Sequence, residues 1–359
     1  MSDRQEHFVR PTTSRPPSLF NLSLLAVFFG LVAGLGGYLL GRTFLPTQFN
    51  FFNNQPELKI NLEQPLVDLA NNNQKSIAGI YRSSKVIAGV GEPVYTNNDF
   101  LGSAVVVTSD GWLMTTDQVV SGSKEIVLLG NQSYDIKSTK SDKFSGAVFI
   151  KIEANGLQPI NFQLSDSLKS GERVYTSLDL PSSLDHSFGA ALVANTHYIL
   201  TPYLSTDSLD YYLQVSGDQS ARTLAAPYFN VKGDLIGISY QLNQETLLLP
   251  AEYLRQAVKH LLNNTSRPIW GMAYIDLENN SGFEEKGDMV YSPTGKPVLA
   301  GSLAAKAGIK AGDRLIAINN DLISKDRTVT SILQNYRLGD KIILKINRQG
   351  TDQDIEIKP

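Results

Sequence analysis

The stretch that decides the fold is GSAVVVTSDGWLMTTDQVV, residues 102–120, together with a later one, LAAPYFNVKGDLIGI, residues 224–238. In each stretch two short apolar runs flank a turn, Asp110-Gly111 in the first and Lys232-Gly233-Asp234 in the second. Apolar runs that are separated by such turns are typical of antiparallel strands. Similar runs occur at 86–90, 104–107, 125–129, 147–150, 173–178 and 235–238. Many short strands at this spacing predict a mainly β fold built as a barrel or sandwich.

Composition limits the classes of function. A chain of 359 residues suggests roughly two domains and an additional segment. The chain has no cysteine, which excludes disulfides, thiolate metal sites and cysteine nucleophiles. We expect neither a cofactor nor a metal. The net charge of −3 and the lack of a basic stripe argue against nucleic-acid binding.

A membrane anchor is predicted near the N-terminus. Residues 16–41 carry no charge, and 22–40 would cover most of a ~30 Å hydrocarbon core at ~1.5 Å per residue. We therefore predict a cytoplasmic segment at 1–18 and a transmembrane helix at 19–41. A cleaved signal peptide is the competing interpretation, but no clean small-x-small cleavage site follows the apolar run.

The arginines predict the orientation of this helix. Arg4, Arg10 and Arg15 precede the span, whereas Arg42 alone follows it before Lys59. Positive charge favours the cytoplasmic side. We expect a single-pass membrane protein whose N-terminus is cytoplasmic and whose bulk is periplasmic or at the cell surface.

One face of the predicted helix is made of glycines. Gly30, Gly34, Gly37 and Gly41 recur at i, i+4, i+7 and i+11, which places them on one side of a helix. Small residues in this pattern let two membrane helices approach closely. The pattern predicts helix association; the alternative is a glycine face without a partner.

The rest of the chain divides at two polar stretches. Residues 42–75 are rich in asparagine and glutamine and are predicted to be a linker. Pro250 begins a helical pattern that continues through Leu262 and ends at the polar run 263–268. The folded part is therefore predicted to have domains at 76–264 and 268–359.

The two opening stretches resemble the HtrA/Deg family of serine proteases, and the resemblance covers about residues 76–359. It implies a trypsin-like double β-barrel at 76–264, a helix, and a PDZ domain at 268–359. The PDZ resemblance is carried by AGSLAAKAGIKAGDRLIAIN, residues 300–319. This run is similar to the family's Gly-Ser-Pro-Ala-x-x-Ala-Gly-Leu-x-x-Gly-Asp-x-Ile core, with Leu303 in place of the proline.

The same resemblance implies that the catalytic triad is degenerate. It assigns the histidine to Gln118, the aspartate to Gly146 and the serine to Leu224, with Arg222 in place of an oxyanion-hole glycine. An amide cannot act as a base near neutral pH, glycine has no side chain, and leucine has no nucleophilic atom. We therefore predict a pseudoprotease with no catalytic residue.

An active enzyme with unconventional residues is the alternative. Ser216 and Ser220 lie in the same loop as Leu224, and His186 and His197 lie between the two stretches. On this alternative the chain is an HtrA/Deg-type serine endopeptidase of extracytoplasmic protein quality control. Whether an apolar cleft at Leu224 still binds peptide stays open.

The resemblance also implies a peptide-binding groove. PDZ domains add the C-terminus of a peptide as a strand at the edge of a sheet. The binding loop and edge strand are predicted at Trp270, Gly271, Met272, Ala273, Tyr274 and Ile275, and a facing helix at 328–336 would contribute Val329, Ile332 and Leu333. The alternative is that these residues form core and that the groove is closed or occupied.

The expected function combines these features. We predict a membrane-anchored, catalytically inactive HtrA/Deg-like protein that binds proteins or peptide C-termini as a scaffold, adaptor or regulator. The resemblance further implies assembly, either as a homo-oligomer such as a trimer or with active paralogues.

Overall fold

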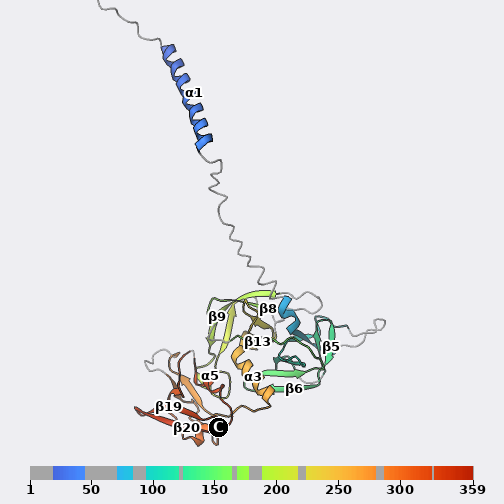
Figure 1. Cartoon of the computed structure of the whole chain (residues 1–359). Helices are drawn as coiled ribbons and strands as arrows, with labels where there is room; N and C mark the ends of the chain where they lie inside the picture. Colours follow the sequence, from blue (N-terminus) through green and yellow to red (C-terminus); the bar gives the residue numbers. More distant parts are fainter. Residues whose placement is uncertain are drawn as a thin grey trace, which may run out of the picture. The chain divides into compact units, whose positions relative to one another are not determined.

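The computed structural model describes residues 19–44, 71–83, 94–120, 124–163, 168–177, 188–216, 224–279, 287–325 and 327–358. The chain forms two compact units, Met1–Ile60 and Asn61–Pro359 (Figure 1). The predicted strand at 86–90, and His186, Ser220 and Arg222, lie outside the described residues.

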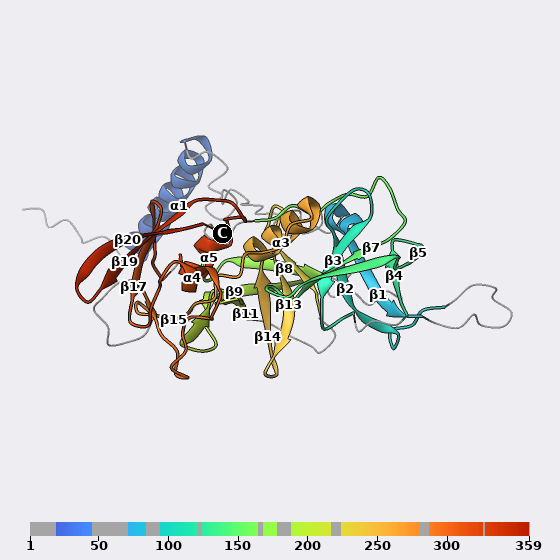
Figure 2. The same ribbon diagram turned by 90° about the horizontal axis from the view of Figure 1, so that it is seen from below.

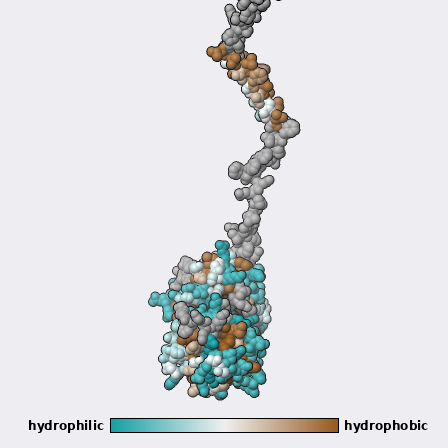
Figure 3. All heavy atoms as spheres, turned by 90° about the vertical axis from the view of Figure 1, so that its left-hand side faces the viewer, coloured by the Kyte–Doolittle hydropathy of each residue, from teal (hydrophilic) through white to brown (hydrophobic). Residues whose placement is uncertain are grey.

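The first unit contains the helix α1, Leu19–Phe44, of 26 residues. Its segment Leu22–Leu40 is long and apolar enough to cross a membrane, and none of it is buried within the protein. In Figure 3 the helix carries brown, apolar side chains over much of its length. Gly30, Gly34 and Gly37 have open space where a Cβ would lie. The surroundings of Gly41 lie outside the description.

The first barrel is an antiparallel sheet with the strand order β5-β4-β1-β2-β3-β7-β6. Gly111 has a φ of +104°, so the predicted turn between β2 and β3 needs glycine. Val105, Leu113 and Ile150 are fully buried in its core. The strands are β1 Ile77–Arg82, β2 Phe100–Val106, β3 Trp112–Thr116, β4 Glu125–Leu129, β5 Gln132–Asp135, β6 Ser138–Asp142 and β7 Ala147–Lys151.

The second barrel is closed, with the order β11-β14-β13-β12-β8-β9. Gly233, with a φ of +84°, turns the chain between β12 and β13, as the sequence predicts. The described end of the predicted linker packs here, since Asn73 Nδ2 donates to the Gly233 carbonyl at 3.0 Å. A 3-10 helix, Gln74–Ser76, follows Asn73. The strands are β8 Arg173–Ser177, β9 Phe188–Tyr198, β11 Tyr212–Ser216, β12 Pro227–Phe229, β13 Leu235–Leu242 and β14 Glu245–Pro250.

Helix α3, Ala251–Asn263, follows the second barrel with Pro250 as its N-cap. Leu254 and Val258 are buried on the predicted apolar face. Asn264 ends the helix in the left-handed conformation, with a φ of 50°. The predicted helix and its C-terminal break are thus confirmed.

The C-terminal domain is a sheet with two short helices. Its core surrounds the fully buried Trp270 and Tyr274. Arg348 fixes the turn before β17 by pairing with Asp313 at 2.6 Å. The elements are β15 Ala273–Asp276, β16 Asp288–Val290, α4 Leu303–Lys306, β17 Arg314–Ile318, β18 Asp321–Leu322, α5 Val329–Leu333, β19 Ile342–Arg348 and β20 Thr351–Ile357. The predicted mainly β fold, with barrels and a C-terminal domain of this kind, is confirmed.

One strand of the C-terminal sheet comes from the second barrel region. Strand β10, Tyr203–Ser205, lies in the connection between β9 and β11, yet it pairs with β15. The sheet therefore has the order β10-β15-β16-β17-β19-β20. Figure 2 shows β15 on the side of the C-terminal domain that faces β9 and β11.

Candidate functional site

Gln118 joins the two barrels through its side-chain amide. Its Nε2 donates to the Gln241 carbonyl at 2.5 Å, and the Gln241 N–H donates to its Oε1 at 2.8 Å. Gln241 lies on β13 of the second barrel, whereas Gln118 follows β3 of the first. Both polar groups of the amide are therefore engaged by one backbone residue, as they would be in a strand pair.

Gly146 lies directly before β7 and has a φ of +73°, which a residue with a side chain rarely adopts. A Cβ at this position would lie 3.4 Å from the Tyr240 ring and 3.8 Å from Asp117 Oδ1. Burial, and then the neighbouring Asp117 carboxylate, raise the pKa of Tyr240 to about 12. A neutral tyrosine thus fills the space in front of Gly146.

Leu224 packs against the core of the first barrel, and its carbonyl accepts the Ser103 N–H at 3.1 Å. A Cβ on Gly102 would come within 2.7 Å of this carbonyl and 2.5 Å of a Val119 methyl. Gly102 therefore lets the Leu224 loop approach the segment that carries Gln118. The next residue, Ala225, has a φ of 54°, a strained value for alanine.

The three predicted triad positions thus meet at the junction of the barrels. A cavity of ≈ 390 Å³ opens beside Gly146. It is lined from the first barrel by Asp117, from the second by Tyr240, and from the β9–β11 connection by Leu204. The cavity has room for a side chain or a short peptide.

The described alternative residues are engaged elsewhere. Ser216 Oγ donates to the Leu192 carbonyl of β9 at 3.4 Å. The His197 ring stacks on Tyr211 at a centroid distance of 4.3 Å, and its Nδ1 lies 3.2 Å from Thr196 Oγ1. Ser216 and His197 therefore have separate partners.

The residues predicted to form the peptide groove are mostly core. Their side chains are at most 1% exposed and share one cluster: Trp270, Met272, Tyr274, Val329, Ile332 and Leu333. Ala273 and Ile275 alternate with them and are half-buried. Gly271 has a φ of +74°, and a Cβ there would clash with Ser302.

The edge of β15 that does not face β16 is paired with β10. The pairing is antiparallel, with Tyr203 opposite Ile275, Leu204 opposite Tyr274 and Ser205 opposite Ala273. Leu204 is 5% exposed and belongs to the core of the C-terminal domain. The strand that was predicted to be the edge of the peptide groove is therefore paired with another segment of the same chain.

The predicted binding loop holds a carboxylate. Asp207 accepts the Trp270 N–H at 2.8 Å and the Gly271 N–H at 2.7 Å. Beside it, the Thr206 N–H donates to the Met272 carbonyl at 2.9 Å, and the Met272 N–H donates to Thr206 Oγ1 at 3.0 Å. Burial raises the pKa of Asp207, against the effect of the two N–H donors. Sequence reasoning missed these residues, since Ser205-Thr206-Asp207 resembles an ordinary turn.

Asp210 is a buried carboxylate beneath this region. It accepts the Tyr253 hydroxyl of α3 at 2.6 Å, the Tyr274 hydroxyl of β15 at 3.3 Å, and the Thr328 hydroxyl. Thr328 is also the N-cap of α5, accepting the Ser331 N–H at 3.1 Å. Burial raises the pKa of Asp210 despite these donors. The β9–β11 connection is thus bonded to α3, β15 and α5.

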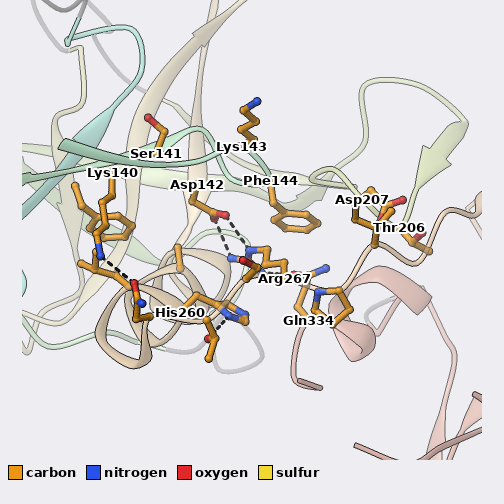
Figure 4. A pocket seen from close by; sticks show the side chains of 18 residues that line it. Lys140, Ser141, Asp142, Lys143, Phe144, Thr206, Asp207, His260, Arg267 and Gln334 are labelled. Carbon is orange, nitrogen blue, oxygen red and sulfur yellow. Dashed lines mark hydrogen bonds and ion pairs between the residues drawn. The ribbon is translucent and has the colours of Figure 1, made fainter. Parts of the chain in front are cut away.

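A second cavity, of ≈ 460 Å³, lies where α3, the β6–β7 turn and the C-terminal domain meet (Figure 4). Arg267 donates from Nε to Asp142 Oδ1 and from Nη2 to Asp142 Oδ2, each at 2.9 Å, and its guanidinium lies 4.5 Å from the Phe144 ring centroid. It also donates to Gln334. Burial and the charge of Arg267 lower the pKa of His260, which lines the same cavity. Arg267 therefore links the first barrel to the C-terminal domain.

Comparisons with known proteins agree with this architecture. Residues 102–238 match the trypsin-like peptidase domain and residues 275–358 match the PDZ domain. A probable periplasmic serine endoprotease, DegP-like, of Hahella chejuensis is 24% identical over 276 residues, and one of a Marinomonas species is 25% identical over 268. Both matches cover 72% of this chain and 56% of the relative, so the chain spans little more than half the length of these proteins.

Solved structures give the same result for the fold. The HtrA-type protease AlgW with a decapeptide superposes with a TM-score of 0.58 at 17% identity, covering 81% of this chain and 97% of that one. AlgW with a tripeptide gives 0.59 at 17% identity, covering 81% and 95%. The chain thus has a trypsin-like peptidase domain followed by a PDZ domain, and it is similar in sequence to DegP-like endoproteases and in fold to the HtrA-type protease AlgW.

Proposed function

We propose that this chain is a catalytically inactive, membrane-anchored HtrA-type protein that acts by binding other protein chains. The observation that carries the proposal is that the Gln118 side-chain amide bonds to the backbone of the second barrel. Both of its polar groups are bonded to the Gln241 backbone, and an amide has no basic site to offer a nucleophile. The position that would hold the base therefore stabilises the barrel junction instead.

The neighbouring positions support the same proposal. Tyr240 fills the space in front of Gly146, and Leu224 contributes an apolar side chain to the core. An acyl-transfer site needs a nucleophile, a base and a group that orients the base within hydrogen-bond reach. Here each of the three places is used for packing or for joining the barrels.

The partner-binding part of the proposal rests on the PDZ domain. Its loop presents the N–H groups of Trp270 and Gly271 to a carboxylate, which is the chemistry that recognises a chain terminus. The exposed apolar helix α1 and the periplasmic DegP-like relatives are consistent with a membrane-anchored protein whose bulk is extracytoplasmic. Assembly as a trimer, or with active paralogues in protein quality control, belongs to the same proposal.

A fluorophosphonate probe tests the inactivity directly. The full-length chain in detergent micelles should show neither labelling nor hydrolysis of casein, with trypsin as the positive control. Labelling that is lost in Ser216→Ala or Ser220→Ala would establish an active endopeptidase and overturn the proposal. Hydrolysis that survives both substitutions points to a contaminating protease, which a catalytic-site titration of the sample would reveal.

A further inference from the structure

Residues 203–207, which we call the strap, lie where a PDZ domain binds a peptide. A peptide added by strand pairing runs antiparallel to the edge strand and places its carboxylate at the N–H groups of the binding loop. The strap is antiparallel to β15, and its C-terminal end, Asp207, reaches Trp270 and Gly271. The side-chain carboxylate of Asp207 thus takes the place of a terminal carboxylate.

The strap also shows the side-chain alternation of a docked strand. Leu204 and Thr206 are buried, at 5% and 0% exposed. Tyr203 and Ser205, which alternate with them, are 45% exposed and half-buried, respectively. A period of two is what strand geometry gives when one face contacts a core. The groove helix contributes as well, since Thr330 Oγ1 of α5 donates to the Ser205 carbonyl at 3.3 Å. The strap therefore contacts the edge strand, the loop and the helix of the groove.

We propose that the strap is a built-in competitor of the PDZ groove. A partner's C-terminus then binds only when residues 203–207 leave, placing its α-carboxylate at Trp270 and Gly271 and an aliphatic side chain where Leu204 lies. This inference rests on the proposed function, in which the PDZ domain binds other protein chains. A competitor on the same chain acts at an effective concentration on the order of mM, so it selects for tight or locally concentrated partners.

The strap also contacts the barrel junction. Leu204 and Ser205 line the cavity beside Gly146, together with Asp117 and Tyr240.

A disulfide lock tests the strap in its native place. The chain has no cysteine, so Ser205→Cys with Ala273→Cys gives a single possible disulfide. These residues are cross-strand partners, and antiparallel partners have Cα atoms about 4.5–5.5 Å apart, within the range of disulfides. The matched control is Lys345→Cys with Asp354→Cys, exposed partners on β19 and β20 at the other side of the sheet.

A second variant releases the strap. Leu204→Asp places a charge in the core position, where it cannot stay buried without a partner. Leu322→Asp is the matched control, because Leu322 is 68% exposed on β18 of the same domain. Should Leu204→Asp fail to fold, the oxidised and reduced forms of the disulfide variant still decide the question.

The probe is a fluorescein-labelled peptide with the sequence of residues 200–207, in which the last aspartate is replaced by alanine with a free carboxylate. Its C-terminal amide is the control ligand. Binding is measured by anisotropy with the full-length chain in micelles. Leu204→Asp should bind the acid about tenfold more tightly than the parent, because the apparent affinity rises with the fraction of open groove. The oxidised lock should not bind, and reduction should restore the parent affinity.

Each outcome decides one claim. Equal binding by the locked, reduced and Leu204→Asp forms would overturn the strap as a competitor but leave partner binding intact. Binding of the amide as tightly as the acid would overturn the assignment of the loop to a terminal carboxylate. No binding by any form would overturn both the competitor and the PDZ part of the proposed function, while the fluorophosphonate test of inactivity would be unaffected.

Discussion

At position 118 a single amide links two barrels that are distant in the sequence. Gln118→Ala removes both hydrogen bonds and leaves the N–H and carbonyl of Gln241 unpaired in a half-buried place. We expect a loss of about 2 kcal/mol in the free energy of unfolding, measured by urea denaturation. Gln241→Ala is the control, because the bonds use its backbone and should survive. Equal stability of Gln118→Ala and the parent would show that the link contributes nothing.

The buried carboxylate of Asp210 predicts a dependence of stability on pH. Its pKa is raised above the ordinary value of 3.8, chiefly by burial, so the folded state binds the proton more tightly than the unfolded state. The stability from this group is present below pH 3.8 and is lost as the pH rises through the raised pKa. We expect the melting temperature of Asp210→Asn to fall less than that of the parent between about pH 4 and pH 7.

Asp288 adds a similar dependence of stability on pH, because burial raises its pKa as well. It is present in both the parent and Asp210→Asn. The comparison therefore uses the difference between the two pH profiles and not either profile alone. Parallel profiles would mean that Asp210 titrates alike in the folded and unfolded states.

At the scale of single elements, helix α1 is predicted to associate with a second membrane helix through its glycine face. Gly34→Ile places a branched side chain on the glycine face, which has open space in the isolated helix. Close packing of two helices through this face would then be blocked. We expect a several-fold lower signal in a bacterial membrane reporter of helix dimerisation. Val32→Ile, on the opposite side of the helix, should leave the signal unchanged, and an equal loss in both would argue against the face.

The strands and turns were predictable because their signals are local. Two short sequences predict the turns, Asp110-Gly111 and Lys232-Gly233-Asp234, and Pro250 predicts the start of α3. A strand and a helix lie at the ranges predicted for the edge strand and the facing helix, as β15 and α5, but the pairing of β15 with β10 was not predicted. The contact of Asp207 with Trp270 joins residues 63 apart, and nothing in the turn-like run 205–207 shows that a loop of N–H groups receives it. Pairings of this kind depend on the packed domains.

For the whole folded unit, several connections tie the two barrels to the C-terminal domain. They include the β10–β15 pairing, the hydroxyl bonds to Asp210, and Arg267, which bonds to Asp142 of the first barrel and to Gln334 of the C-terminal domain. Domains connected by a shared sheet should unfold together. We expect a single calorimetric transition for this part of the protein and a split into two for Leu204→Asp. Two transitions in the parent would show that the domains are energetically independent.

The shared sheet has a practical consequence for dividing this protein. A fragment that begins at Pro268 would follow the sequence boundary, but it would leave β10 behind and uncover the backbone edge of β15. The slot filled by Leu204 would open beside it. An uncovered strand edge can pair with a strand of another molecule. Fragments cut at this border should pair edge to edge and form dimers or aggregates, and the boundary that keeps the sheet covered begins before Tyr203.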